Sequence, residues 1–227
     1  MNIQTILSRL SVKRLLFHSE ADFQHALAWG FHQQFPDAQV RLELPVNTSA
    51  GVMHVDLWMT DAGDGVAIEL KYKTNKLTVD MAGEHYALKS QSAQDLGRYD
   101  FLKDLERLEY LADTYPNLTG YAIFLTNDSN YWTNSTRANT VDASYRLNEG
   151  RQTTGTLSWG SGAKPGTIKN REKALILKRP YTWNWQDYSE TGGDGSRKFR
   201  MLVVRVTRFT TSDVSANVAD IGATSVP

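Results

Sequence analysis

The chain has 227 residues, its 25 Lys and Arg balance its 25 Asp and Glu, and 41% of its residues are hydrophobic. This length and composition suit one globular domain, with or without an appendage, and exclude a disordered or collagenous chain. The absence of cysteine excludes a disulfide scaffold, a thiolate zinc site, an iron–sulfur cluster and a cysteine nucleophile.

The zero net charge hides an uneven distribution of charge along the chain. Residues 20–64 carry seven acids and one base, whereas residues 164–208 carry eleven bases and four acids. Two interpretations are open. The segments form two solvated faces of opposite sign, or an acidic pocket that binds cations lies beside a basic surface that binds phosphates.

The apolar segments of the chain are short. None approaches the roughly 18 residues that a membrane-spanning helix needs. The apolar residues near the N-terminus are spaced as in a helix and are interrupted by Arg9, Lys13 and Arg14, unlike those of a signal peptide. We therefore expect no membrane association and a cytoplasmic location.

The first third of the chain alternates between helical and strand periodicity. Residues 3–17 predict an amphipathic helix, and a second helix begins at Ser19, which forms a capping box with Asp22. Apolar alternation then predicts three strands, at 40–46, 53–59 and 66–72. Turns are expected between them at 47–51 and 63–65.

The rest of the chain predicts one long helix and further strands. Helical spacing extends from about residue 81 to residue 115, with a break near 89–92. Strands are expected at 121–125, 174–177 and 201–206, and residues 127–170 read as long loops with a short hairpin.

This order of elements predicts an α/β fold with a central mixed β-sheet flanked by helices and a β-rich, loop-rich C-terminal part. We assign residues 1–126 to the core and residues 127–208 to a β-rich part of the same domain that carries the basic surface. Residues 209–227 are small and polar, and we expect a flexible tail there.

The hairpin at 53–72 places charged residues on one face of two otherwise apolar strands. A two-residue loop at Ala62-Gly63 sets Asp56 across from Glu69, and loops shifted by one or two residues set it across from Lys71 or Lys73 instead. An odd loop or a bulge would break this alignment.

Two carboxylates directly across a sheet repel each other unless a proton or a cation lies between them. Mg²⁺ prefers such oxygen ligands, and Lys71 lies two residues from Glu69 on the same face. The simpler alternative is an exposed strand face with a Glu–Lys pair. Because the flanking residues are apolar, we expect charges that are buried and therefore need partners.

Asp56 on a strand, a hairpin turn and then Ile68-Glu69-Leu70-Lys71 resemble the core motif of the PD-(D/E)xK nucleases, the restriction-endonuclease-like superfamily. Val55 stands where the family name has proline. Glu20 matches, by position and helix phase, an acid that the family commonly carries on the preceding helix. The resemblance covers about residues 15–125.

The resemblance implies a Mg²⁺-dependent nuclease of a restriction, defence or repair setting, with Mn²⁺ as a substitute metal. Asp56, Glu69 and the carbonyl of Leu70 would bind the metal, and Glu20 would complete the site or bind through water. Lys71 would position the attacking water or help to deprotonate it. DNA is the implied substrate, although the residues themselves do not distinguish DNA from RNA.

Further candidate residues lie outside the hairpin. In several branches of the superfamily a Gln and a Tyr on the following helix approach the active site, and Gln94 and Tyr99 are similar but spaced by five instead of four; Gln91 competes with Gln94 for this assignment. We expect phosphate contacts from four basic residues, Lys73, Arg197, Lys198 and Arg200.

Four aromatic residues lie in loop-like sequence of the C-terminal part, namely Trp132, Trp183, Trp185 and Tyr188. Such residues stack on bases or pack an accessory core, and we favour the core. Two other functions stay open. One is a noncatalytic nucleic-acid or protein-binding module on a nuclease-like scaffold, and the other is a structural protein that assembles through its tail. A homodimer is also an option, since many relatives dimerise to cut both strands.

Overall fold

The computed structural model describes residues 2–48, 51–137, 139–192 and 197–208. The tail expected at 209–227 therefore lies outside the described residues. In chain order the elements are α1 (Ile3–Lys13), α2 (Glu20–Gln34), β1 (Gln39–Thr48), β2 (Gly51–Asp61), β3 (Asp64–Lys73), β4 (Leu77–Met81), β5 (Glu84–Leu88), α3 (Gln94–Thr114), β6 (Leu118–Thr126), η1 (Ser129–Tyr131), η2 (Ala143–Tyr145), β7 (Gln152–Leu157), β8 (Leu175–Thr182), β9 (Trp185–Glu190) and β10 (Lys198–Val206).

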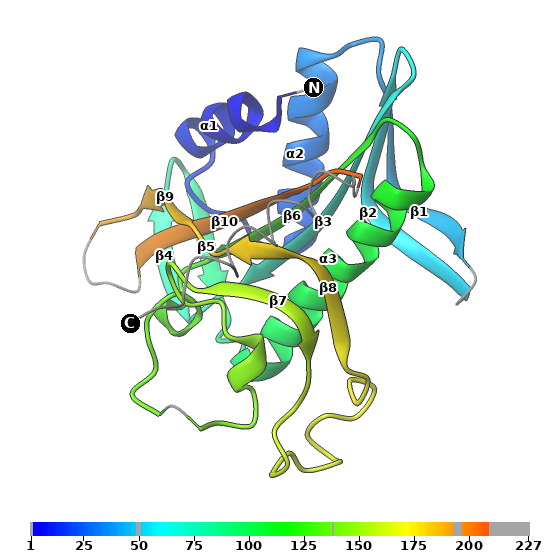
Figure 1. Ribbon diagram of the computed structural model, residues 1–227. Coiled ribbons are helices and arrows are strands. Elements are labelled where there is room, and N and C mark those ends of the chain that lie inside the picture. The colour runs from blue at the N-terminus through cyan, green and yellow to red at the C-terminus, as the bar shows by residue number, and fades with distance from the viewer. Residues whose placement is uncertain (1, 49–50, 138, 193–196, 209–227) are drawn as a thin grey trace, which may run out of the picture.

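A six-stranded sheet in the order β1-β2-β3-β6-β10-β9 forms the centre of the molecule (Figure 1). β3 and β6 pair in parallel, whereas the other neighbouring strands pair antiparallel. The sheet is thus mixed, and the expectation of an α/β fold with a central mixed sheet is confirmed.

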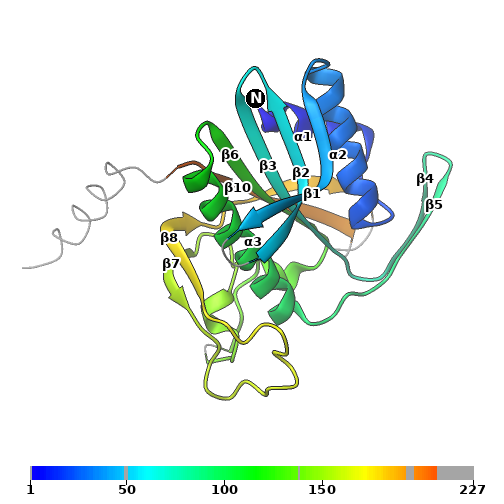
Figure 2. The ribbon, with the colours of Figure 1, turned by 90° about the vertical axis from the view of Figure 1, so that its right-hand side faces the viewer.

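Helices cover both faces of this sheet. The apolar sides of α1 and α2 pack with residues of β3 and β6 such as Ile68 and Ile123. On the opposite face α3 packs with Ala67, Ala122 and Phe124 of the same two strands. Figure 2 shows α2 and α3 on opposite sides of the sheet.

The small sheet of β7 and β8 packs on α3 from outside. Leu175, Leu177 and Tyr181 of β8 share one hydrophobic core with α3 and the central sheet. α3 is therefore enclosed between two sheets, and several of its charged residues, including Asp104 and Glu109, are buried. None of the helices in the described residues is long and apolar enough to cross a membrane.

The N-terminal helices follow the predicted signals with one difference. Ser19 is the N-cap of α2, and its side chain accepts a hydrogen bond from the backbone N–H of Asp22 at 3.1 Å. α1 ends at Lys13 instead of residue 17, since the chain turns extended at Arg14. Leu16 and Phe17 are nevertheless buried, so these apolar residues belong to the hydrophobic core although they lie outside the helix.

The expected helix from 81 to 115 is wrong in its first part. α3 begins only at Gln94, and residues 77–88 form the hairpin of β4 and β5, which extends from the body of the molecule (Figure 2). Ala82 and Gly83 form its turn with positive φ angles. Leu77 and Leu88 anchor the base of the hairpin in the core.

The aromatic residues of the C-terminal part belong to the core. Trp183, Trp185 and Tyr188 are buried, and Trp132 packs partly buried against the same core as Trp185. The Trp183 and Trp185 indole N–H groups donate to backbone carbonyls of the 143–148 region. The preferred alternative, packing instead of base stacking, is confirmed for these residues, although the strand β9 was missed.

Candidate functional site

The turn at Ala62-Gly63 fixes the register of the motif hairpin. β2 and β3 pair from Asp61↔Asp64 to Leu57↔Ile68. Both turn residues have positive φ, as a two-residue type I′ turn requires. This is the register expected for a loop at Ala62-Gly63, but the ladder ends one residue before Asp56. Val55 and Leu57 lie in the cores on opposite faces of the sheet, so β2 is irregular at Asp56 and the expected directly facing pair of Asp56 and Glu69 does not form.

Asp56 and Glu20 accept hydrogen bonds from the backbone of β3, beyond the point where β2 stops pairing with β3. The β2–β3 ladder ends at Leu57↔Ile68, while β3 continues along β6 to Lys73. Asp56 Oδ2 accepts a hydrogen bond from the Leu70 backbone N–H at 2.6 Å, and Glu20 Oε2 accepts one from that of Tyr72 at 2.7 Å. The two carboxylates thus replace strand carbonyls as acceptors for these buried N–H groups.

Gln24 of α2 is hydrogen-bonded to both β1 and β2 at the position where β2 separates from β3. The Gln24 side-chain amide donates to the backbone carbonyl of Asp56 at 2.7 Å and to Glu43 Oε1 at 2.8 Å. Glu43 has a φ of 52°, and the β1–β2 ladder skips the Glu43–Asp56 position. This local irregularity lets β2 bend away from β3 at Asp56.

Glu69 and Lys71 contact charged residues of α3. Lys71 Nζ lies 2.5 Å from Asp104 Oδ2 and donates a hydrogen bond to the Leu70 carbonyl at 3.1 Å. Arg107 Nη2 lies 3.1 Å from Glu69 Oε1, and Arg107 Nη1 donates to Asp104 Oδ1 at 2.9 Å. Two acids and two bases therefore alternate between β3 and α3.

Burial dominates the electrostatics of the two motif carboxyls. It raises the pKa of Asp56 to about 6, against the opposing effects of the Leu70 N–H and Lys71. Burial and then the nearby Asp104 carboxylate raise the pKa of Glu69 well above its usual range, and Arg107 opposes the shift. Burial therefore shifts the equilibrium of both carboxyls toward the protonated form, relative to carboxyls in water.

The surroundings of Lys71 favour its charged form, unlike those of the two carboxyls. Burial alone would lower the pKa of its ammonium group, but Asp104 first, and Glu20 and Asp56 after it, raise the pKa above the usual value. Lys71 is therefore charged at neutral pH. These couplings show that Glu20, Asp56, Glu69 and Lys71, which the sequence spreads over 52 positions, lie in one cluster.

The sequence reasoning missed Asp104 and Arg107. Asp104 lies three residues after Phe101 and four before Leu108, both fully or almost fully buried, so helical spacing placed it on the buried side of α3. A buried acid in that position needs a cationic partner, and Lys71 on the facing strand provides one. This signal was present in the sequence and could have been used.

Gln94 lies away from this cluster. Its side-chain amide donates to Asp128 Oδ2 at 2.8 Å, at the edge where β6 ends. Along α3 it lies ten residues, about 15 Å, from Asp104. Its competitor Gln91 accepts a hydrogen bond from the Thr74 N–H at 3.2 Å, and the Tyr99 hydroxyl donates to the Lys173 carbonyl at 2.8 Å.

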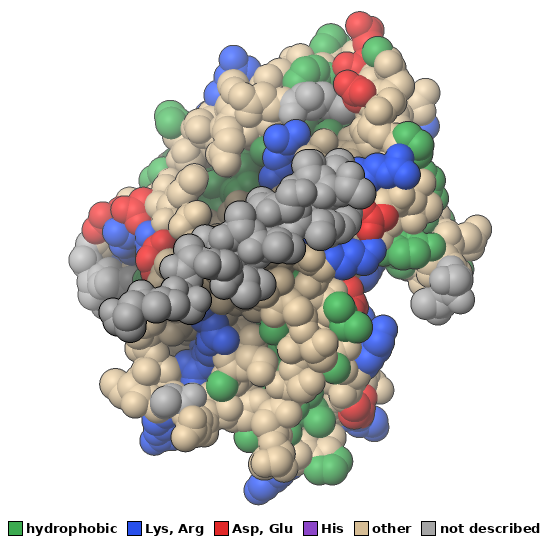
Figure 3. All heavy atoms as spheres, in the orientation of Figure 1, with side chains coloured by type: hydrophobic (Ala, Val, Ile, Leu, Met, Phe, Trp, Pro, Cys, Tyr) green, Lys and Arg blue, Asp and Glu red, His purple; other side chains and the backbone are tan. Residues whose placement is uncertain are grey.

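The expected phosphate-contact residues are partly engaged with acids. Lys198 Nζ lies 2.9 Å from Asp187, and Arg200 contacts both Asp187 and Glu149, at 3.1 and 2.9 Å. Lys73 is the half-buried last residue of β3, and Arg197 is half-buried directly before β10. On the face shown in Figure 3, Lys and Arg side chains stand at several separate places, and several lie beside Asp or Glu.

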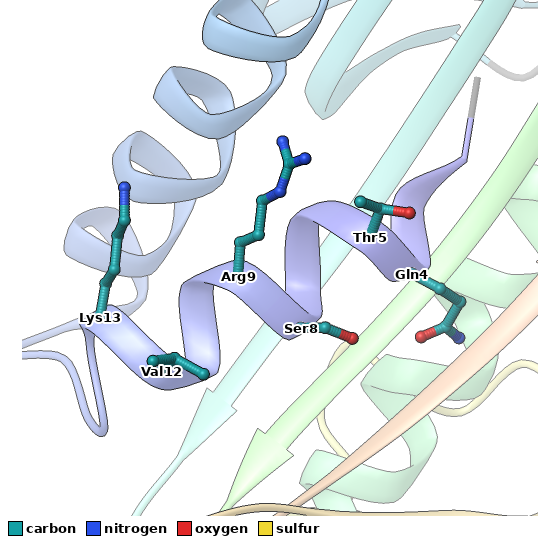
Figure 4. Close-up of a pocket in the computed structure, with 6 residues that line it drawn as sticks. All are labelled: Gln4, Thr5, Ser8, Arg9, Val12 and Lys13. Atoms are coloured by element: carbon teal, nitrogen blue, oxygen red, sulfur yellow. The ribbon is translucent and has the colours of Figure 1, made fainter.

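The hollow drawn in Figure 4 lies elsewhere. It has a volume of about 560 Å³, and all six of its labelled lining residues come from α1, so it contains none of the motif residues. Within the described residues, no group of three His, Asp or Glu side chains gathers closely enough to hold a metal ion unaided.

The chain was compared with known proteins. No protein-family profile matches it, and no curated protein matches it at a significant level of similarity.

Proposed function

We propose that the protein is a Mg²⁺-dependent nuclease with a restriction-endonuclease-like core, which hydrolyses phosphodiester bonds of DNA in restriction, defence or repair. The observation that carries the proposal is the convergence of three charged residues of the motif at the end of the β2–β3 ladder, where Asp56 Oδ2 accepts a hydrogen bond from the Leu70 N–H at 2.6 Å, between Glu69 and Lys71 on β3. The order α2-β1-β2-β3-α3-β6, with β3 and β6 parallel, supports it further.

The cluster fits a hard divalent cation in two respects. Glu69 Oε1 is buried without a hydrogen-bond partner among the described residues, and burial first, with repulsion from neighbouring carboxylates after it, raises the pKa of both Asp56 and Glu69. Asp56, Glu69 and the Leu70 carbonyl would hold Mg²⁺ or Mn²⁺, with Glu20 beside them. When bound, the metal would supply Lewis-acid stabilisation of the charge on the phosphate.

Lys71 has a narrower role in this proposal than its residue type allows. Because Asp104 keeps it charged at neutral pH, it does not remove a proton from water. Its ammonium group orients the attacking water by hydrogen bonding and neutralises negative charge on the phosphate. Asp104 fixes the direction of the lysine side chain toward the site.

Plasmid cleavage in Mg²⁺ or Mn²⁺ tests the proposal. We expect Asp56→Asn and Lys71→Met each to lower the cleavage rate by about a hundredfold or more, since each removes a charge that stabilises the transition state. Asp64→Asn and Lys103→Met are matched controls, because both residues are exposed on the same strand and helix as site residues. Full activity in the Asp56 and Lys71 variants would overturn the site.

One observation favours a noncatalytic binding module on the same scaffold as the second candidate. Arg107 and Asp104 already partner Glu69 and Lys71, as in a site whose charges have only a structural role. Calorimetry separates the two functions. Tight DNA binding without any Mg²⁺ or Mn²⁺ binding would favour the module, and metal binding that Asp56→Asn abolishes would favour the nuclease.

A further inference from the structure

Arg107 makes more contacts to the motif hairpin than any other α3 residue described above. Its Nη2 lies 3.1 Å from Glu69 Oε1 and also donates to the His54 carbonyl, while its Nη1 donates to Asp104 Oδ1. Its Nε lies 3.4 Å from Met53 Sδ. The guanidinium thus joins both motif strands to the helix.

The Glu69 carboxylate requires a positive partner. Its side chain is only 3% exposed, and an ionised carboxylate at that depth is costly without a nearby cation. Arg107, whose side chain is 24% exposed, supplies that charge from the more open side. The contact lacks hydrogen-bond geometry, because Glu69 Oε1 has no hydrogen-bond partner among the described residues.

We propose that Arg107 is a resident counter-ion that competes with the divalent metal for Glu69, so that metal binding requires the guanidinium to release this carboxylate. The proposal rests on the proposed function and deepens it. A metal and a guanidinium at the same carboxylate repel each other, and both neutralise the same charge. Glu69 therefore needs only one of these two cations at a time to balance its charge.

The other partners of Arg107 make its release from Glu69 feasible. Asp104 and the His54 carbonyl remain as hydrogen-bond acceptors for Arg107, so the guanidinium keeps two partners when Glu69 binds a metal ion instead. Arg107 thereby pairs with Glu69 in the metal-free site and lowers the apparent metal affinity by the fraction of molecules in which it holds Glu69.

Mn²⁺ calorimetry on the full chain without nucleic acid tests the proposal. We expect Arg107→Gln to bind Mn²⁺ about tenfold more tightly than the wild type, because the competing cation is gone. Lys103→Gln removes the same charge from an exposed position one turn away on α3, and we expect it to change the affinity little. An Arg107→Gln affinity equal to or weaker than that of the wild type overturns the competition.

Thermal unfolding gives a readout that separates competition from a purely structural role. In EDTA, Arg107→Gln should melt below the wild type, because Glu69 loses its ion-pair partner and Asp104 keeps Lys71 but loses Arg107. In Mn²⁺ its melting temperature should rise by more than that of the wild type. An equal rise in both proteins contradicts the proposal. Absence of Mn²⁺ binding in both proteins, by contrast, overturns the proposed nuclease function itself.

Arg107→Lys extends the test should the glutamine variant fail to fold even with Mn²⁺. An ammonium lacks the planar fork that spans Glu69, Asp104 and the His54 carbonyl together. We expect a several-fold tighter Mn²⁺ affinity for this variant, and an unchanged or weaker affinity overturns the proposal.

Discussion

Asp56 binds its proton more tightly in the folded protein than in the unfolded chain. Its carboxyl has an ordinary pKa of 3.8, and burial raises this to about 6 in the fold. Between these values the folded state binds more protons than the unfolded state, so the free energy of unfolding decreases as the pH rises. Glu69 contributes with the same sign, because its pKa is raised as well.

We therefore expect the metal-free protein to lose stability as the pH rises from about 4 to about 6. Asp56→Asn cannot ionise, so its melting temperature should fall less over this range. The measurement is thermal unfolding in a chelating buffer at several pH values. Asp64→Asn, at an exposed turn position, should keep the wild-type dependence, and the same dependence in Asp56→Asn would contradict the assignment.

Single residues of the site differ in how far the sequence identified them. The motif spacing identified Asp56, Glu69 and Lys71, and the helix phase identified Glu20. The partners of these residues came only with the structure, since contacts such as Lys71–Asp104 join positions 33 apart through a helix whose packing angle no local pattern encodes.

Among the elements, the β2–β3 turn has the greatest effect on the site. A two-residue turn with both φ angles positive favours Asn-Gly, whereas Ala62, at a φ of 48°, pays the steric cost of its Cβ in the left-handed region. A slip of this turn by one residue would move Asp56 away from the Leu70 N–H that donates to its carboxylate. The turn thus decides which groups of β3 the Asp56 carboxylate meets.

We expect Ala62→Asn to raise the free energy of unfolding by roughly 0.5–1 kcal/mol, because Asn tolerates the left-handed conformation better than Ala. Urea denaturation measures this. Ala82→Asn, in the equivalent turn of β4 and β5, should act in the same direction, and Gly63→Ala, at a φ of 91°, should destabilise. Destabilisation by Ala62→Asn would contradict the left-handed conformation of residue 62 in this turn.

Element prediction succeeded where periodicity was long and failed where it was short. The apolar stripe from Phe101 to Ala112 identified α3, because many helical repeats agree. β4 and β5 have five residues each, too few to distinguish alternation from helical spacing. The Ala82-Gly83 turn between them was the usable signal for a hairpin.

At the scale of the whole molecule, the C-terminal part completes the core. β10 pairs with β6 along residues Arg200–Val206 and places Leu202 and Val204 in the core around α3. β8 adds Leu175 and Leu177 to the same core. Residues 1–126 alone would leave one edge of β6 and the outer side of α3 uncovered.

We therefore expect a fragment of residues 1–126 to lack cooperative unfolding, whereas residues 1–208 should unfold in one transition. Far-ultraviolet circular dichroism during thermal unfolding reports this, because both fragments contain helices and strands whose loss can be followed. The exposed apolar surface of the shorter fragment should also bind a hydrophobic dye. A folded and cooperative 1–126 fragment would show that the two parts are separate domains.

The charge distribution shows what each level decides. Sequence counting separates an acid-rich segment from a base-rich one. In the fold, however, Arg171 pairs with Asp100 at 2.7 Å and Lys178 pairs with Asp113, so bases from the C-terminal part meet acids of α3. The separation along the chain is therefore only partly a separation in space.

The sequence by itself determined the α/β class, the α2 cap and the Ala62-Gly63 turn of the motif hairpin, because periodicity, capping and turn chemistry act over short stretches of chain. Only the tertiary structure decided which cations neutralise those carboxylates. Arg107 and Asp104 reach the hairpin because α3 is enclosed between the central sheet and β8. That enclosure includes contacts between residues about 70 positions apart, such as the hydrogen bonds that the Ile176 and Lys178 backbone N–H groups donate to Glu106 and Glu109. Contacts at such separations leave no periodic pattern in the sequence.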